Sequence, residues 1–491
     1  MNLARKVLIL ILTAGCLVTV FAAKPWRRNK KNAEEEPFLF VTGVVPGSIS
    51  SQLGIKEGDI LRSYNGIGVQ SIDELEAAKQ AAVDSAEVIF DRGEEALSFV
   101  FPVGPMGVFL KQKLPELKFD EDAVVLQGIL PLVSEDAMNN SFILSLTRAS
   151  NFLKDTLDYI TIMGLSGSAF RLQLHRKWAP SAMLASEGYR TDTMALNALG
   201  YEYQYLKLNE GMSNMESMRQ AIIINLDAGS PVLGFNLNGD STWGIIVGYQ
   251  KHGREIIVRT YNSKRDGYSI AEIFPQQVYL LEGRTIPPTL REAIIKSFAI
   301  AQDILESKPV CAYKCGVDAL NGWQQLLETS DFYSIPRDEF NRIVETNYLM
   351  FVQLAEDRGF AAEYLKSIVS EFSDISDKLM ALIKLYEAEA EHLNEGIEQH
   401  NVIFHAKNFK TQYDWTPQMR IKETSYLRFA KIKEEEALKI WREINLIYNP
   451  EPLENEEDVV APEGEVNPES ADTSSTKKPE PKSPDMPEGA Q

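Results

Sequence analysis

The side chains that could bind a metal gather in one acidic stretch toward the C-terminal end of the chain. His392, His400 and His405 lie near Glu389 and Glu398, and Glu389 and His392 form a Glu-x-x-His motif. Di-metal sites in helical bundles use that motif twice, whereas it occurs once here, among other acidic residues. The pattern favours a solvated acidic helix face. We therefore predict no metal site, and we predict no cofactor because the chain has no phosphate-binding Gly-Lys-Ser or Gly-Lys-Thr motif.

The chain has 3 cysteines, which are too few for a disulfide framework in a protein of 491 residues. Cys16 lies in an apolar N-terminal segment, and Cys311 and Cys315 are close together further along the chain. Two half-buried thiols are the simpler interpretation of that pair. A local bridge outside the cytoplasm is the alternative, with poor geometry if both residues lie in one regular helix.

Charge excludes one class of partner. The 70 acidic and 50 basic residues give a formal net charge of −20. A surface that binds nucleic acid needs a basic stripe, and no such stripe follows Lys31. We therefore exclude nucleic acid as a partner.

The N-terminus has the pattern of an export signal. Arg5 and Lys6 precede an apolar run over residues 7–23, and small residues fit cleavage after Ala22 or Ala23. Two alternatives remain open. Residues 12–16 resemble a lipoprotein box that would lipidate Cys16, and the run could instead remain as a membrane anchor. Each interpretation places the rest of the chain outside the cytoplasm, in the periplasm, on a membrane or secreted.

Composition and periodicity divide the chain into the units that must position any site. We predict an α+β multidomain protein with a signal peptide or anchor at 1–23, a charged linker at 24–36, a β-barrel or sandwich module at 37–110, an α+β domain at 120–285, a helical bundle at 287–448 and a disordered acidic, Pro-rich tail at 449–491. The tail has almost no aliphatic residues, so burial cannot offset its chain entropy.

The module at 37–110 shows an ordered series of turn and cap signals. An apolar strand from Phe38 ends at Pro46-Gly47, and a short helix from Ser48 to Leu53 stops at Gly54, which suits a left-handed helix end. A strand over Ile60–Tyr64 then leads to a tight Asn-Gly turn.

The second half of the module continues with a helix and two strands. Ser71 is an N-cap with Glu74 in the reciprocal position, and the helix runs to about Val83. Strands are expected at Glu87–Asp91 and Ala96–Pro102. With the Val-Val-Pro-Gly-Ser and Gly-Asp-Ile-Leu segments, this region resembles the PDZ domains of bacterial envelope proteases.

The resemblance implies that the module binds a peptide or a protein C-terminus by strand addition beside its long helix. Leu75, Ala78 and Lys79 are candidates for one wall of the ligand site. The carboxylate-binding loop is not at its usual place, and Gly104–Val108, at the far end of the module, has a comparable character. A docking spacer that binds no ligand is the alternative role.

The second unit alternates helices and strands. We expect a turn entering a helix at Gly164–Leu172, helices at Thr191–Leu199 and Met215–Leu226, and strands at Tyr201–Leu208, Ser230–Asn236, Trp243–Tyr249 and Glu255–Tyr261. This order resembles papain-like peptidases of bacteriocin leaders and the N-terminal domain of butirosin-type acyltransferases.

That resemblance implies a nucleophilic Cys at a helix start, a His on a strand and an Asn or Asp after the next strand. Ser166, Thr242 and Asn262 fall at these three positions, so only Asn262 is of a compatible type. His175 lies too far along from Ser166 for one helix to pair them, and His252 lies in a polar turn. Trp178 and Trp243 are best explained as core aromatics.

We therefore expect a non-catalytic exported protein. Its PDZ-like module would bind a peptide or protein C-terminus in the envelope, and a papain-like pseudoenzyme domain would offer a second binding surface. The alternative is a serine-dependent hydrolase or acyltransferase that uses Ser166.

Overall fold

In the computed structural model, the described residues are 36–132, 140–261, 263 and 267–449. The export segment with Cys16, most of the charged linker, Asn262 and the tail from residue 450 onward lie outside them. Within these described ranges, no helix is both long enough and apolar enough to cross a membrane.

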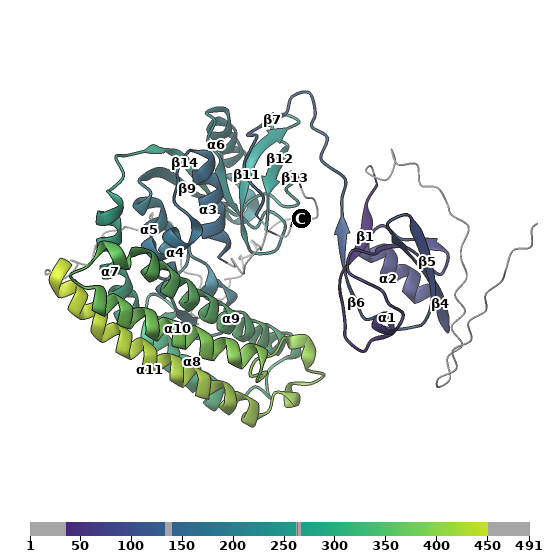
Figure 1. The fold of residues 1–491 in the computed structure, drawn as a ribbon. Helices are drawn as coiled ribbons and strands as arrows, with labels where there is room; N and C mark the ends of the chain where they lie inside the picture. Colours follow the sequence, from purple (N-terminus) through teal and green to yellow (C-terminus); the bar gives the residue numbers. More distant parts are fainter. Residues whose placement is uncertain (1–35, 133–139, 262, 264–266, 450–491) are drawn as a thin grey trace, which may run out of the picture.

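Residues 38–113, here called the N-terminal unit, form an antiparallel sheet with one long helix, α2 (Ile72–Ala81) (Figure 1). The strands lie in the order β5 (Glu95–Pro102), β4 (Ser85–Arg92), β2 (Ile60–Tyr64), β1 (Phe38–Val44) and β6 (Val108–Lys113), with β3 (Ile67–Gly68) paired to β2. Side chains alternate between the two faces of a strand. The buried residues of β1 and β4, such as Leu39, Val41 and Phe90, form a single core with Leu75 of α2.

The local signals of the N-terminal unit are confirmed. Ser48 is the N-cap of α1 (Ile49–Gln52), and Ser71 is the N-cap of α2, where its hydroxyl accepts from the Glu74 N–H at 3.2 Å. Gly54 has φ +73°, as expected for the left-handed residue after a helix. The sequence did not predict β6, which extends past residue 110.

Residues 124–449, here called the C-terminal body, contain a second antiparallel sheet. Its order is β13 (Ser269–Ile270), β12 (Glu255–Arg259), β11 (Trp243–Gln250), β10 (Val232–Phe235), β14 (Gln277–Arg284) and β9 (Tyr201–Lys207), and β7 (Val124–Val125) also pairs with β11. The expected strands at residues 201–208, 230–236, 243–249 and 255–261 are confirmed, with ends shifted by a few residues.

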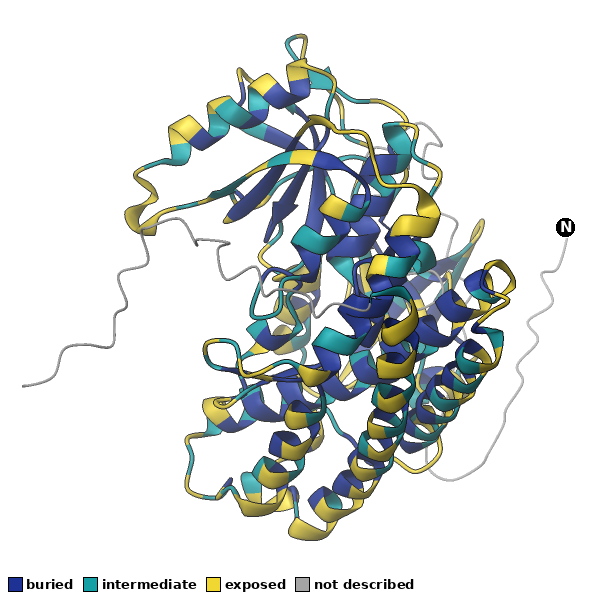
Figure 2. Ribbon diagram, turned by 90° about the vertical axis from the view of Figure 1, so that its left-hand side faces the viewer, coloured by how far each residue is buried: buried dark blue, intermediate teal, exposed yellow. Residues whose placement is uncertain are grey.

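Both faces of this sheet are covered, which explains why β10 and β11 are buried nearly throughout (Figure 2). Val232, Ile246 and Val258 face helix α6 (Met215–Asp227). The alternate residues, such as Leu233 and Ile245, pack with the helices α3 (Ser141–Phe152), α4 (Tyr159–Leu165) and α5 (Thr191–Ala198). The sheet is thus the middle layer of three.

Five long helices follow: α7 (Leu290–Glu306), α8 (Gly316–Thr329), α9 (Arg337–Ile368), α10 (Ser376–Glu398) and α11 (Pro417–Tyr448). They pack on the α3–α4–α5 side, so one hydrophobic core continues from the sheet into the bundle. Phe170 lies 5.5 Å from Trp441 between ring centroids, and a Cβ on Gly164 would lie 2.1 Å from the Tyr364 ring. The sheet and the helical bundle therefore share one packed interior, although the predicted boundary at residues 285–287 separates them in the sequence.

A buried cation lies at the point where three helices meet that interior. Arg358 of α9 donates from Nη1 to the carbonyl of Ala169 at 2.9 Å and from Nε to Glu434 of α11 at 2.5 Å. Glu389 of α10 lies 3.6 Å from the same guanidinium, and at most 1% of any of the three charged side chains is exposed. The prediction that Glu389 belongs to a solvated acidic face is wrong, because α9 and α11 cover that face of α10.

Two carboxyl groups share one guanidinium there, which changes their protonation. Burial, and then the charge of Glu434, raise the pKa of Glu389 well above its ordinary value, against the lowering effect of Arg358. Burial also raises the pKa of Glu434. Glu389 is therefore the carboxyl that keeps a proton in the folded chain.

Replacing Glu389 with Gln should flatten the dependence of stability on pH. A carboxyl with a raised folded-state pKa contributes stability below its unfolded pKa and loses that contribution as the pH rises toward the folded pKa. The Glu389→Gln variant cannot ionise, so its free energy of unfolding should fall less between about pH 5 and pH 8, by up to about 1.4 kcal/mol per pH unit. Urea denaturation followed by helical circular dichroism measures this slope.

Glu391→Gln is the matched control, since Glu391 lies on the same helix and is exposed. That variant should keep the wild-type slope. Equal slopes in the two variants would contradict the assignment of the retained proton to Glu389.

Candidate functional site

Strand β6 lies at one edge of the N-terminal sheet, where β1 is its only partner among the described residues. The carbonyl of Gly107 accepts from the Val45 N–H at 2.9 Å, and the carbonyl of Phe109 accepts from Thr42 Oγ1 at 3.3 Å, so both point toward β1. Backbone groups of successive strand residues point to opposite sides. Those of Val108, Leu110 and Gln112 therefore point away from β1, along the open edge.

The loop that leads into β6 has its carbonyl groups occupied. Ser50 Oγ donates to the carbonyl of Met106 at 2.6 Å, and Ser48 Oγ donates to that of Gly107 at 3.3 Å. The N–H groups of Met106 and Gly107 have no partner among the described residues. Consecutive free N–H groups in a turn are typical of a site for an anion such as a carboxylate.

Glycine is required at one position of this loop. Gly107 has φ +78°, and a Cβ there would lie 2.3 Å from Cβ of Ser48. Gly104 also has a positive φ, +141°, but nothing lies near its missing Cβ. The approach of the loop to α1 thus depends on Gly107.

An ion pair fixes α1, and with it the two serines. The Arg92 guanidinium donates to both carboxyl oxygens of Asp59 at 2.7 Å and to the carbonyl of Gly54 at 2.8 Å. Burial alone would raise the pKa of Asp59, but the hydrogen bonds from Arg92 and from the Lys56 N–H outweigh it, and the pKa is lowered. Asp59 therefore stays ionised and ties β2 and β4 to the end of α1.

The apolar wall beside the open edge comes from β6 and the core. Val108 and Leu110 pack partly against the core of the N-terminal unit, as does Ala82 after α2. Of the predicted wall residues, Leu75 and Ala78 lie in this core with 2% exposure each, and Lys79 pairs with Glu76 at 2.7 Å. Their contact with a ligand stays a prediction.

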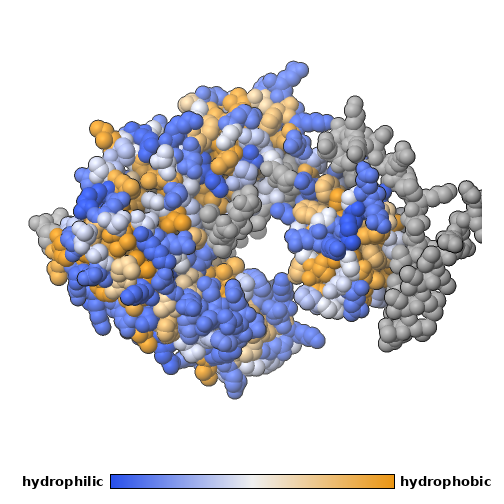
Figure 3. Space-filling model, viewed as in Figure 1, coloured by the Kyte–Doolittle hydropathy of each residue, from blue (hydrophilic) through white to orange (hydrophobic). Residues whose placement is uncertain are grey.

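Other hydrophobic side chains of the N-terminal unit are exposed. Phe109 is 59% exposed, Val103 43% and Val45 40%. Figure 3 shows hydrophobic residues among hydrophilic ones on the face of this unit that is in view. Phe109 alternates with Val108 and Leu110 along β6, so its side chain lies on the other face of the sheet from theirs.

The residues predicted as a pseudoenzyme site do not come together around Ser166. Ser166 is the C-cap of α4, so the prediction that it begins a helix is wrong. Its hydroxyl is fully buried, with Met163 O at 3.3 Å and Ser168 Oγ at 2.9 Å, and no histidine or carboxylate bonds to it within the described ranges. The negative end of a helix dipole also disfavours an alkoxide.

The helix that does begin against β11 is α3. Its first residue, Ser141, accepts a hydrogen bond from the Trp243 N–H at 3.0 Å, and Asn140 is the N-cap. Thr242, beside it, donates to Asp240 Oδ1 at 2.7 Å. The Asn-Asn-Ser sequence before an apolar run is an N-cap signal that identifies this helix start. The prediction of a helix start within Gly164–Leu172 is wrong, because α4 ends there.

Neither candidate histidine is hydrogen-bonded to Ser166 or to Ser141 in the described part of the chain. His175 lies in β8 (Gln173–His175), with its ring 5.2 Å from Tyr313, and burial lowers its pKa. His252 is in an exposed turn, 3.2 Å from Asp122. Trp178 and Trp243 are buried core residues, as predicted.

The remaining chemistry-bearing residues also have structural positions. Cys311 is exposed and Cys315 is buried at the N-cap of α8, and both thiols are free. Among residues 36–132, 140–261, 263 and 267–449, no group of three or more His, Cys, Asp or Glu is placed to hold a metal ion.

The open edge, the loop before it and the helix beside them have the arrangement of a PDZ domain. The family model for the PDZ domain matches residues 40–89, so the chain contains a PDZ domain. That match covers β1 to most of β4, the part of the unit in which the turn and cap signals are found.

Comparison of whole chains adds little. No curated protein matches this chain. A crystal structure of a PDZ domain protein from Parabacteroides distasonis is 10% identical, with a TM-score of 0.13, and the match covers 60% of this chain and 64% of that one. This chain thus spans less than two thirds of that protein, and a TM-score of this size does not establish a shared fold.

Replacing Gly107 with Ala should loosen the loop and the edge strand. The variant combines the cost of a positive φ, about 1 kcal/mol, with displacement of Ser48. Hydrogen exchange measured by mass spectrometry on the full chain should show at least about tenfold faster exchange in residues 104–113. Gly54→Ala is the control, because Gly54 has a similar φ of +73° but nothing within 4 Å of its missing Cβ. Equal effects of the two variants on residues 104–113 would contradict the steric argument.

Proposed function

We propose that this protein is an exported, non-catalytic adaptor whose PDZ domain binds the C-terminus of a peptide or protein along the open edge of β6. The observation that carries the proposal is the position of the free N–H groups of Met106 and Gly107, which lie at the start of that edge. A strand that ends in a carboxylate has the matching chemistry, because it offers alternating donors and acceptors and a terminal negative charge.

The order of the loop N–H groups and the outward backbone groups along β6 defines how such a ligand binds. Its carboxylate accepts from the loop N–H groups at Met106 and Gly107. Its preceding residues then run antiparallel to β6 and exchange hydrogen bonds with Leu110 and Gln112, whose backbone groups point outward. Ligand side chains on the inner side meet Val108 and Leu110 and approach α2, where Leu75, Ala78 and Lys79 are the candidate wall residues.

The C-terminal body serves in this proposal as a second binding surface and as a rigid support. The proposal assigns no chemical step to Ser166, because a fully buried hydroxyl bonded to Met163 O and Ser168 cannot approach a substrate. The location outside the cytoplasm rests on the pattern of residues 1–23.

The Leu110→Pro variant should weaken binding of a free-carboxylate peptide while the sheet persists. Proline removes an N–H that points away from β1, and edge strands tolerate proline at such positions. Losing one or two main-chain hydrogen bonds, each worth about 0.5–1.5 kcal/mol, should raise the Kd about three- to tenfold. A C-terminal peptide library identifies a ligand, and fluorescence anisotropy with the full chain then measures its affinity.

Phe109→Ser is the matched control, since Phe109 is exposed and its backbone groups face β1. Its affinity should stay within about twofold of the wild type, and amidating the peptide C-terminus should abolish binding. Binding that survives amidation, or no binding by any library peptide, would leave the PDZ domain as a docking spacer and refute the proposal.

A further inference from the structure

A small polar cavity lies inside the C-terminal body, between the segment before β8 and helix α9. About 20 Å³ of it can be occupied by a water-sized body, within a wider empty space of about 250 Å³ that is partly open to solvent. Charged, amide and thioether side chains line it, among them Arg171, Gln173, Met183, Met350, Gln353 and Asp357.

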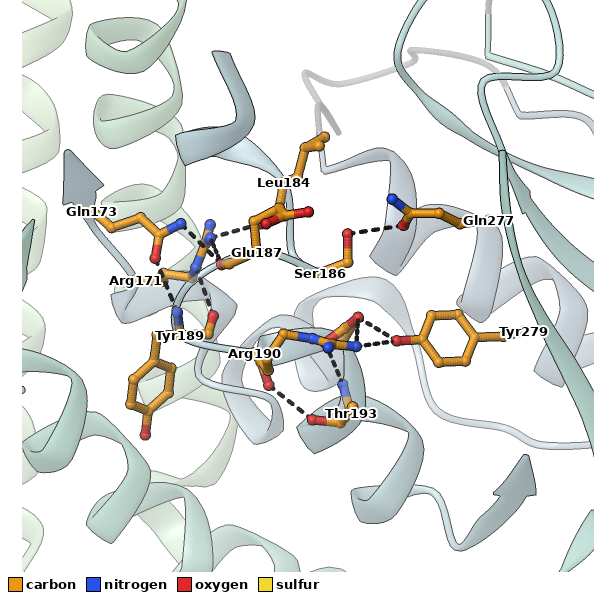
Figure 4. A network of polar contacts seen from close by, with 11 residues as sticks. Arg171, Gln173, Leu184, Ser186, Glu187, Tyr189, Arg190, Thr193, Gln277 and Tyr279 are labelled. Atoms are coloured by element: carbon orange, nitrogen blue, oxygen red, sulfur yellow. Dashed lines mark hydrogen bonds and ion pairs between the residues drawn. The ribbon is translucent and has the colours of Figure 1, made fainter. Parts of the chain in front are cut away.

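Arg171 is held in place by the backbone of a single loop (Figure 4). Its Nη2 donates to the carbonyls of Leu184 at 2.7 Å and Glu187 at 3.0 Å, and its Nε donates to that of Tyr189 at 3.1 Å. Gln173 fixes the same loop by bonding to Glu187 O and to the Tyr189 N–H. The guanidinium therefore has a fixed orientation in the fold.

The charge of Arg171 has no carboxylate partner within ion-pair distance in the described ranges. Only 7% of the residue is exposed, and burial lowers its pKa to about 10, so it is still a cation at neutral pH. Nη1 of Arg171 has no hydrogen-bond partner among the described residues, and it is not fully enclosed by protein. Since Arg171 lines the cavity, this nitrogen is the one that can bind a ligand there.

The opposite wall is formed by α9. Asp357 is 3% exposed and lines the cavity with Gln353, which lies one turn before it on α9. Burial, and then the charge of Glu356, raise its pKa well above the ordinary value, against Arg358 and Arg171, which lower it. When Asp357 holds its proton, Arg171 gives the cavity a net positive charge.

We propose that this cavity is a binding site for one small monovalent anion of the size of chloride or formate. The anion lies against Nη1 of Arg171, with the side chains of Gln353 and Asp357 completing its shell. Isolated buried charge is costly unless it is compensated, and an anion compensates Arg171, which has no ion-pair partner within the described ranges. A cation is excluded by the same guanidinium.

The site couples anion binding to a proton. An ionised Asp357 would repel the anion, so affinity is highest while Asp357 is protonated and falls as the pH rises through its pKa in the folded protein. In Asp357→Asn, this pH dependence should disappear and binding should remain.

Thermal unfolding of the full chain tests the site, with sodium chloride or formate titrated against sodium sulfate at constant ionic strength. Chloride or formate should raise the unfolding temperature in a saturable way, and sulfate should not, because it is too large and doubly charged. A response to formate but not chloride assigns the site to carboxylates, and a response to chloride assigns it to halides. Crystals grown in bromide should show an anomalous peak beside Arg171.

Two variants separate binding from folding. Arg171→Gln should abolish the response to the anion, but it removes loop contacts as well, so Gln353→Leu is the decisive variant and should lower anion affinity at least about fivefold. Gln325→Leu, at an exposed position of α8, is its control and should respond like the wild type. An equal response to all three anions, or an unchanged response in Gln353→Leu, would overturn the proposal.

Discussion

The C-terminal body depends on one buried guanidinium, that of Arg358. It joins three helices to the sheet-side segment, because its Nε donates to Glu434 and its Nη1 donates to the carbonyl of Ala169, with Glu389 close by. Removing one partner from such a group typically costs about 3–5 kcal/mol, since the remaining charge stays buried. The register of α9, α10 and α11 against residues 168–170 is thereby specified, which the apolar contacts of Phe170 and Trp441 alone would not do.

Two arginines bond near the short segment Ala169–Arg171, and they are compensated differently. Arg358 donates to Ala169 O and lies beside the carboxyl groups of Glu434 and Glu389, whereas Arg171 donates to the loop carbonyls of Leu184, Glu187 and Tyr189. Arg171 also lines the cavity together with Asp357. The two environments also set the protonation of the neighbouring acids, because each acid is desolvated and competes for a limited positive charge.

In the N-terminal unit, the order of the strands in the sheet differs from their order in the chain, and this difference leaves β6 at the edge of the sheet. The loop at Gly104–Val108 comes last in the unit, yet β6 pairs with β1, the first strand. The two serines at the start of α1 then bind the loop carbonyls and leave its N–H groups free. The Asp59–Arg92 pair supports this arrangement from the other end of α1.

The sequence by itself determined the features that depend on contacts between residues close together in the chain. The caps at Ser48 and Ser71, the turn at Asn65-Gly66 and the strands around α6 were predicted correctly, because each depends on groups a few residues apart. Only the tertiary structure decided the rest. Gly164 is required inside α4 because the Tyr364 ring occupies the space of a Cβ. Glu389 is buried beside Arg358, a residue far from it in the chain but 3.6 Å away in space. Strand β6 has one open edge because the first strand, β1, pairs with its other edge. These outcomes depend on partners far apart in the chain, which local patterns do not specify.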